Sequence, residues 1–105
     1  MSWEVVCLEE AKNDLSRLDG SPKLQVLKSI RKVSQNPVSI FDGGYGKPLG
    51  KIGTIDLTGC FKIKLKSVGI RVVYKLAVEN RQMKIVIIGL RSDSWVYEKA
   101  FKRIN

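Results

Sequence analysis

Apolar residues in the first third of the chain recur at helical spacing and predict two helices. A short apolar run at 3–8 suits a strand, and apolar positions three and four residues apart then predict a helix over 9–18. Ser21-Pro22 is typical of a second helix start, because serine is a common N-cap and proline fits the first turn. Asn36-Pro37 is expected to end this helix. Its expected apolar face consists of Leu24, Leu27, Ile30 and Val33.

Apolar runs of strand length follow a glycine-rich segment at 38–54, which is predicted to be a loop. Connections of hairpin length separate these runs, so the strands are expected to pair as an antiparallel meander. The last run is apolar on both faces, which favours a central position. Helical spacing from Ser92 onward predicts a short closing helix. The expected strands are 55–57, 61–66, 70–78 and 83–90.

These elements predict an α+β fold with one domain over residues 1–105. Two N-terminal helices are expected to pack on one face of an antiparallel β-sheet, and a short C-terminal helix follows. No apolar run approaches the ~20 residues of a membrane-spanning helix, and no signal peptide is visible. The two cysteines lack metal-binding spacing, and because two make a disulfide framework unlikely, a reducing compartment is the default. We therefore expect a cytoplasmic protein with no membrane partner.

The net charge and the lack of histidine limit which partners and which catalytic groups the chain can have. Nineteen lysines and arginines oppose ten acidic residues, which gives a net charge of +9 and indicates an anionic partner such as nucleic acid. The chain contains no histidine, the commonest general acid or base and the commonest metal ligand. We expect neither a metal nor a cofactor, and any catalysis must rely on other side chains.

Cations alternate with apolar residues in the segment FKIKLKSVGIRVVYKL at 61–76. Neighbouring side chains of a strand point to opposite faces, so the cations are expected on the face away from the core. If 67–70 is the loop, Lys66 lies opposite Arg71, although a bulge at Gly69 would change this pairing. A solvated sheet face is the alternative, but clustered like charges are destabilising without an anion. The expected basic patch consists of Lys62, Lys64, Lys66, Arg71 and Lys75.

Such a patch suits cleavage of RNA by its own 2′-hydroxyl. Fixed cations stabilise the negative charge that develops on phosphorus, and arginine can hold two phosphate oxygens at once. Arg91 and Tyr97 follow the last expected strand. Tyr97 either belongs to this site or is a core aromatic of the closing helix.

The segments 61–76 and 85–105 resemble the RelE branch of the RelE/ParE toxins of bacterial type II toxin–antitoxin systems. The family shows a K-x-K pair, an arginine after a glycine turn, an R-x5-Y segment after the last strand and a basic K-R-I ending; all are present here. The resemblance implies a RelE-like microbial ribonuclease fold and a cognate acidic, RelB-like antitoxin. It also implies metal-free cleavage of messenger RNA in the ribosomal A site, which inhibits translation.

The resemblance also assigns roles to residues. Lys62 and Lys64 would handle proton transfer and phosphate charge, and Arg71 would stabilise the transition state. Arg91 would contact the scissile phosphate or protonate the leaving group, and Tyr97 would stack against or orient the base. Contacts with RNA or the ribosome are expected from Lys28, Arg31, Lys32, Lys47, Lys51, Lys66 and Lys75.

The chain departs from the family pattern in two places. The segment GKPLGKIG lacks a frequent arginine, for which Lys47 or Lys51 would substitute. Where relatives often carry further charge, this chain has SDSW, so Asp93 and Trp95 are expected to alter ribosome docking or substrate preference. Two alternatives stay open: a ParE-like inhibitor of DNA gyrase without nuclease activity, and a basic RNA-binding module without catalysis. The five catalytic-type residues favour the nuclease, because a gyrase inhibitor does not need them.

Overall fold

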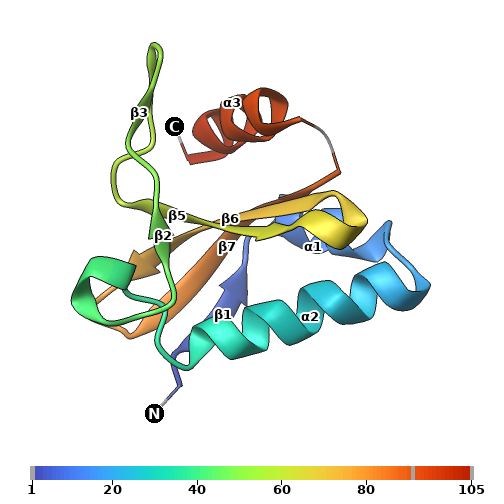
Figure 1. Cartoon of the computed structure of the whole chain (residues 1–105), viewed down its shortest axis with the longest axis horizontal. Helices are drawn as coiled ribbons and strands as arrows, with labels where there is room; N and C mark the ends of the chain where they lie inside the picture. Colours follow the sequence, from blue (N-terminus) through green and yellow to red (C-terminus); the bar gives the residue numbers. More distant parts are fainter. Residues whose placement is uncertain (1, 91, 105) are drawn as a thin grey trace.

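The computed structural model describes residues 2–90 and 92–104 and has three layers, with a five-stranded sheet between helices (Figure 1). Two helices cover one face and the third covers the other, which confirms the α+β class. No helix within these ranges is long and apolar enough to cross a membrane. The helices are α1 (Glu9–Ser16), α2 (Gly20–Ser34) and α3 (Asp93–Ile104), with 3-10 turns η1 (Ile40–Asp42) and η2 (Lys66–Val68). The strands are β1 (Glu4–Cys7), β2 (Lys47–Pro48), β3 (Lys51–Ile52), β4 (Ile55–Asp56), β5 (Cys60–Leu65), β6 (Ile70–Ala77) and β7 (Gln82–Gly89).

The strand order in the main sheet is β1-β7-β6-β5-β2. The central position predicted for the last strand is confirmed, because β7 lies between β1 and β6. The sheet is antiparallel except for β1, which pairs in parallel with β7; the two helices that follow β1 give the long connection that a parallel pairing needs. The expected loop at 38–54 contains β2 and β3, and β3 forms a separate ribbon with β4. Strands of two residues are too short to show alternation in a sequence.

Apolar side chains fill both faces of the sheet and form two cores. Ile70, Val72 and Tyr74 face α1 and α2, as the alternation predicted. On the opposite face, Val73 and Ile87 pack against α3. α3 therefore lies on the face opposite α1 and α2, because this second apolar surface also requires a cover.

The apolar face predicted for the second helix is wrong at two positions. Leu24 is 60% exposed and Leu27 is 42% exposed, whereas Val26 is completely buried. The buried stripe runs through Val26, Ile30 and Val33 at intervals of four and three residues. The helix also begins at Gly20 rather than after Ser21, and its N-cap position is Asp19.

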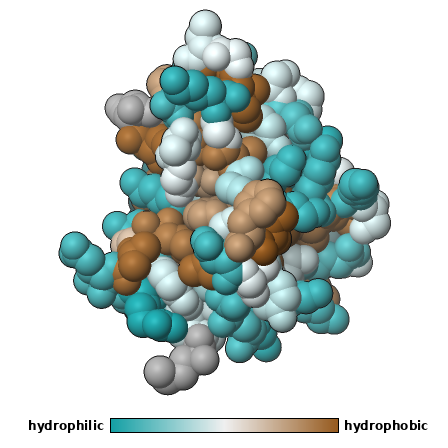
Figure 2. All heavy atoms as spheres, turned by 60° about the vertical axis from the view of Figure 1, so that its left-hand side comes forward, coloured by the Kyte–Doolittle hydropathy of each residue, from teal (hydrophilic) through white to brown (hydrophobic). Residues whose placement is uncertain are grey.

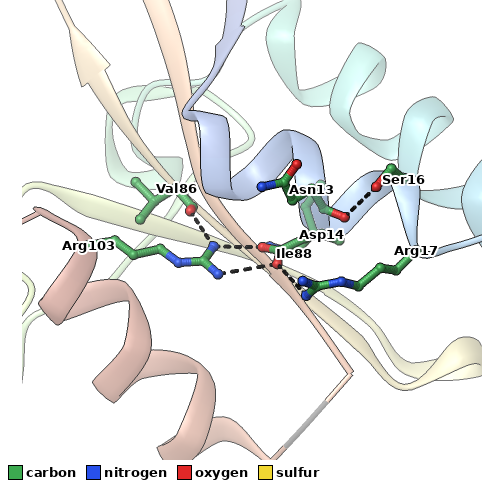
Figure 3. A network of polar contacts seen from close by, with 7 residues as sticks. All are labelled: Asn13, Asp14, Ser16, Arg17, Val86, Ile88 and Arg103. Carbon is green, nitrogen blue, oxygen red and sulfur yellow. Dashed lines mark hydrogen bonds and ion pairs between the residues drawn. The ribbon is translucent and has the colours of Figure 1, made fainter.

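A buried ion pair closes an open part of the sheet edge. β1 pairs only with the first half of β7, so α1 packs beside the second half. There the Asp14 carboxylate accepts a hydrogen bond from the backbone N–H of Ile88 at 3.0 Å, and the Arg103 guanidinium donates to the carbonyl of Val86 at 3.0 Å (Figure 3). Arg103 also binds both carboxylate oxygens of Asp14, at 2.7 and 3.2 Å. The two side chains thus replace a missing strand and join α1, β7 and α3.

The site of this pair coincides with a bulge in β7. Val73 pairs with Ile87 and Tyr74 pairs with Ile85, so Val86 has no partner on β6. The extra residue turns both Val86 and Ile87 toward α3, whereas Ile85 and Ile88 face the other two helices. The apolar character of β7 on both faces follows from this arrangement.

We predict that Asp14→Ala lowers the free energy of unfolding by about 3–5 kcal/mol, because it leaves Arg103 buried without a carboxylate. The Asp14 and Arg103 side chains are only 8% and 11% exposed. Urea unfolding would measure the change. Glu9→Ala is the matched control, because it removes an exposed ion pair to Lys12 on the same helix and should cost less than about 1 kcal/mol. Equal losses in the two variants would contradict a structural role for the buried pair.

Candidate active site

The predicted catalytic cations of β5 and β6 lie together on one face of the sheet. Lys64 is directly opposite Arg71, and Lys62 is opposite Val73. Directly opposed residues of an antiparallel pair share a face, so Lys62, Lys64 and Arg71 all lie on the side that α3 partly covers. The predicted sharing of one face is confirmed.

The predicted pairing of Lys66 with Arg71 is wrong. β5 ends at Leu65, which pairs with Ile70, and Lys66 belongs to the turn η2. Gly69 completes this turn at φ 67°, a left-handed conformation that suits glycine. The four-residue connection preserves the alternation but moves the register by two residues, so that Lys64 rather than Lys66 meets the arginine.

The end of β7 positions the first turn of α3 beside these cations. Gly89 pairs with Arg71, and a Cβ atom at Gly89 would lie 2.7 Å from a methyl group of Val96. Glycine therefore allows α3 to approach the sheet closely. The Ser92 hydroxyl accepts a hydrogen bond from the backbone N–H of Trp95 at 3.4 Å, which caps the helix. Asp93 consequently lies in the first turn, close to Arg71.

Asp93 joins two of the predicted catalytic cations. One carboxylate oxygen lies 3.1 Å from Lys64 Nζ, and the other accepts a hydrogen bond from Arg71 Nε. Arg71 also donates to the carbonyl of Gly69 at 3.2 Å. The hydrogen bonds from Lys64 and Arg71 hold the pKa of Asp93 below its ordinary value of 3.8. All three side chains remain partly exposed, so the carboxylate occupies a position that an external anion can reach.

Tyr97 is a core residue of α3 whose hydroxyl approaches the site. It is 5% exposed and packs in the core between α3 and the sheet. Its hydroxyl oxygen is buried, with no hydrogen-bond partner in residues 2–90 and 92–104. Burial raises the pKa of Tyr97, the Asp93 carboxylate raises it further, and Arg71 opposes the shift. The ring is closed to a nucleobase while α3 is in place, and Arg91 lies outside the described residues.

The remaining predicted binding cations are dispersed. Lys47 on β2 pairs with Lys62 and extends the cation cluster. Lys75 lies four residues from Arg71, about 13 Å along β6, but it is diagonally opposite Lys62, because Lys62 pairs with Val73 and Lys75 pairs with Cys60. Lys75 therefore shares the face that was predicted for the patch, whereas Lys66 lies in the turn η2. Lys51 lies on the separate ribbon opposite Asp56. The α2 residues Lys28, Arg31 and Lys32 are exposed.

The described part of the chain has no group of three or more metal-ligating His, Cys, Asp or Glu side chains. Two features of the site were not predicted from the sequence. The contact of Asp93 with Lys64 and Arg71 was not predicted, although Asp93 departs from the family pattern. Tyr45, beside Lys47, was also missed because it lies in a segment interpreted only as a loop.

We predict that the pKa of Asp93, followed by carbon NMR of its carboxyl group, lies below 3.8. A lowered pKa means that the ion pair is complete above pH 3.8 and is lost as the pH falls through the lowered value. Lys64→Ala should raise this pKa toward its ordinary value, because the hydrogen bond that lowers it most is removed. Lys84→Ala removes a cation from β7 and should leave the pKa unchanged. An unshifted pKa in the native protein would contradict the contact.

Comparison with known proteins identifies close relatives of the chain. It is 31% identical over 105 residues to a protein of Escherichia coli described as RelE-like toxin, and the match covers all of both chains. It is 30% identical over 96 residues to the mRNA interferase toxin RelE of Escherichia coli strain K12, with 91% of this chain and 90% of the relative covered. No protein-family profile matches the sequence.

Solved structures agree with this relationship. A mutant of the Escherichia coli toxin RelE in the free state superposes with a TM-score of 0.74 at 26% identity, and all of both chains is covered. The same mutant in complex with an antitoxin RelBc peptide gives a TM-score of 0.71 at 25% identity, with 95% of each chain covered. The sequence relatives and the similar solved structures are thus all RelE or RelE-like toxins, and each matches this chain over most of its length. This chain belongs to the RelE-type toxins.

Proposed function

We propose that this protein is the toxin of a type II toxin–antitoxin pair and cuts messenger RNA in the ribosomal A site. The relative named mRNA interferase supports nuclease activity over gyrase inhibition. The observation that carries the proposal is the convergence of Lys64 and Arg71 on the two oxygens of one carboxylate. A phosphate group presents similar oxygens, and the same two cations can therefore hold it.

The proposed reaction uses the 2′-hydroxyl of the RNA as nucleophile. The 2′-oxygen bonds to phosphorus and the bond to the 5′-oxygen breaks, leaving a 2′,3′-cyclic phosphate and a 5′-hydroxyl. Lys64 and Arg71 stabilise the extra negative charge of the five-coordinate phosphorus. Lys62, two residues from Lys64 on the same face of β5, is within the same cluster and can serve the proton transfers.

Asp93 competes with the phosphate in this proposal. Its carboxylate already neutralises Lys64 and Arg71, so RNA must exchange with an internal anion before it can react. The exchange requires movement of the Asp93 side chain or of the first turn of α3. The resting site is thus partly neutralised, which lowers its attraction for unrelated anions.

An acidic antitoxin is the proposed protein partner. The net charge of +9 favours association with an acidic chain. The solved complex of the related toxin with an antitoxin peptide supports a partner of this kind.

Lys64→Ala should reduce messenger cleavage on programmed ribosomes at least about 100-fold, because one group that stabilises the transition state is lost. The fold and antitoxin binding should persist, since Lys64 is on an exposed part of β5. Lys84→Ala, on β7 opposite Lys75, is the matched control and should cut normally. Full cleavage by the Lys64 variant would exclude a catalytic role for this residue. DNA damage with intact transcripts in cells that express the native chain would instead support gyrase inhibition.

Asp93→Asn should bind uncleavable 2′-O-methyl RNA about two- to tenfold more tightly than the native chain, because a competing carboxylate is removed. Fluorescence anisotropy at fixed ionic strength would measure the affinity. Glu79→Gln changes the net charge equally in the exposed turn between β6 and β7. If both variants bind equally, the gain reflects net charge alone and Asp93 does not compete at the site.

A further inference from the structure

A cavity of about 240 Å³ opens beside the catalytic cations, where β2 ends and leaves the edge of β5 free. Its wall includes Lys62 and Lys64 from β5 and Lys47 from β2. The opposite wall comes from α2 and from the loop that carries Tyr45. This cavity therefore connects the cation cluster on the α3 side of the sheet with the helical layer on the other side.

Backbone hydrogen bonds to segment 36–38 hold the loop that carries Tyr45. The backbone N–H of Tyr45 donates to the carbonyl of Asn36 at 2.8 Å, and Gly46 donates to Val38 at 2.9 Å. The glycines on either side of Tyr45 lie against the backbone of segment 36–38. A Cβ atom at Gly44 would be 2.2 Å from the carbonyl oxygen of Val38. The segment thus holds an aromatic residue at a defined position while the ring itself remains 49% exposed.

Four lysines line the cavity together with the exposed ring, and no described residue of the lining carries a carboxylate. Lys47 and Lys62 are directly opposed on neighbouring strands, an arrangement that is unfavourable without an anion between or near them. Lys32 Nζ lies 5.7 Å from the centre of the Tyr45 ring. An aromatic face among cations combines the two contacts that single-stranded nucleic acid requires, stacking for a base and charge for its phosphate.

We propose that this cavity binds the nucleotide next to the scissile phosphate, with its base stacked on Tyr45 and its phosphate held by Lys47 and Lys62. The inference rests on the proposed nuclease function, because Lys62 and Lys64 belong to both sites. Stacking on Tyr45 also explains how the site can hold a base while Tyr97 is buried. Tyr45 is the exposed aromatic residue that lines this cavity.

The surrounding surface provides a matched control. The face that carries η1 and β2, on the left of Figure 1, exposes hydrophobic atoms among hydrophilic ones (Figure 2). Phe41 in η1 is 84% exposed and does not line the cavity. Nonspecific binding of RNA to exposed aromatic residues would thus involve Phe41 at least as much as Tyr45.

The test compares a 2′-O-methyl trinucleotide with an abasic trimer that carries the same phosphates, using the full chain. We expect the native protein to bind the base-containing trimer about 5- to 100-fold more tightly than the abasic one. Tyr45→Ala should abolish this difference, Tyr45→Phe should keep it, and Phe41→Ala should not affect it. Urea unfolding of each variant would verify that the fold is intact.

Several results would overturn the proposal. These are equal affinity of the native protein for both trimers, failure to bind the trinucleotide, or an unchanged preference in Tyr45→Ala. Binding of hexaglutamate as tightly as the trinucleotide would instead identify the cavity as a site for an acidic peptide. Cleavage on programmed ribosomes separates this inference from the nuclease function. If the native chain and Tyr45→Ala cut equally and at the same bases, the stacking role fails while the nuclease stands. If the native chain does not cut, the nuclease function fails, and base-dependent binding of the trimer is judged independently.

Discussion

The buried pair of Asp14 and Arg103 determines how the C-terminal helix lies on the sheet. Arg103 comes from the last turn of α3 and Asp14 from α1, and both bind backbone groups of β7 that no strand covers. Leaving such backbone groups unpaired in the interior is costly, so the sheet depends on this ion pair to satisfy them. The docking of α3 then places Asp93 at the opposite end of the helix, beside Arg71. A contact far from the proposed chemistry thus helps to set the geometry of the site.

The cation cluster shows how a basic site can exist in a stable fold without its substrate. Lys62, Lys64 and Arg71 share a face, and their repulsion is partly relieved by Asp93. A carboxylate from the same chain carries one negative charge and is held only by partly exposed contacts. A nucleic acid phosphate brings further contacts along its chain, so it can replace the carboxylate once neighbouring nucleotides are also bound.

Local patterns predicted the face of each residue of β5 and β6, because the period of a strand is independent of its partner. The common face of Lys62, Lys64 and Arg71 follows from this period, and so does the apolar side that faces α1 and α2. The pairing of Lys64 with Arg71 could not be predicted, because it depends on the conformation of four residues in the turn η2.

Long-range contacts explain the other differences between the sequence-based predictions and the structure. Asp14 lies in a short helix where a solvated carboxylate is the ordinary expectation, and its partner is 89 residues away. The position of α3 depends on the bulge at Val86, which no local signal marks. Tyr45 and Asp93 gain their significance only from neighbours on other elements, so the outline of the site was predictable and its anionic and aromatic components were not.

The two ends of α3 are held by contacts of different kinds. At Arg103 the anchor is buried, whereas at Asp93 it is partly exposed and consists of an ion pair that another anion can exchange. At the Asp93 end, loosening is confined to the first turn, because Val96 and Tyr97 directly after it are buried against the sheet. Exchange of anions at the proposed RNA site therefore requires only the first turn of α3 to loosen, while Val96, Tyr97 and Arg103 hold the rest of the helix on the sheet.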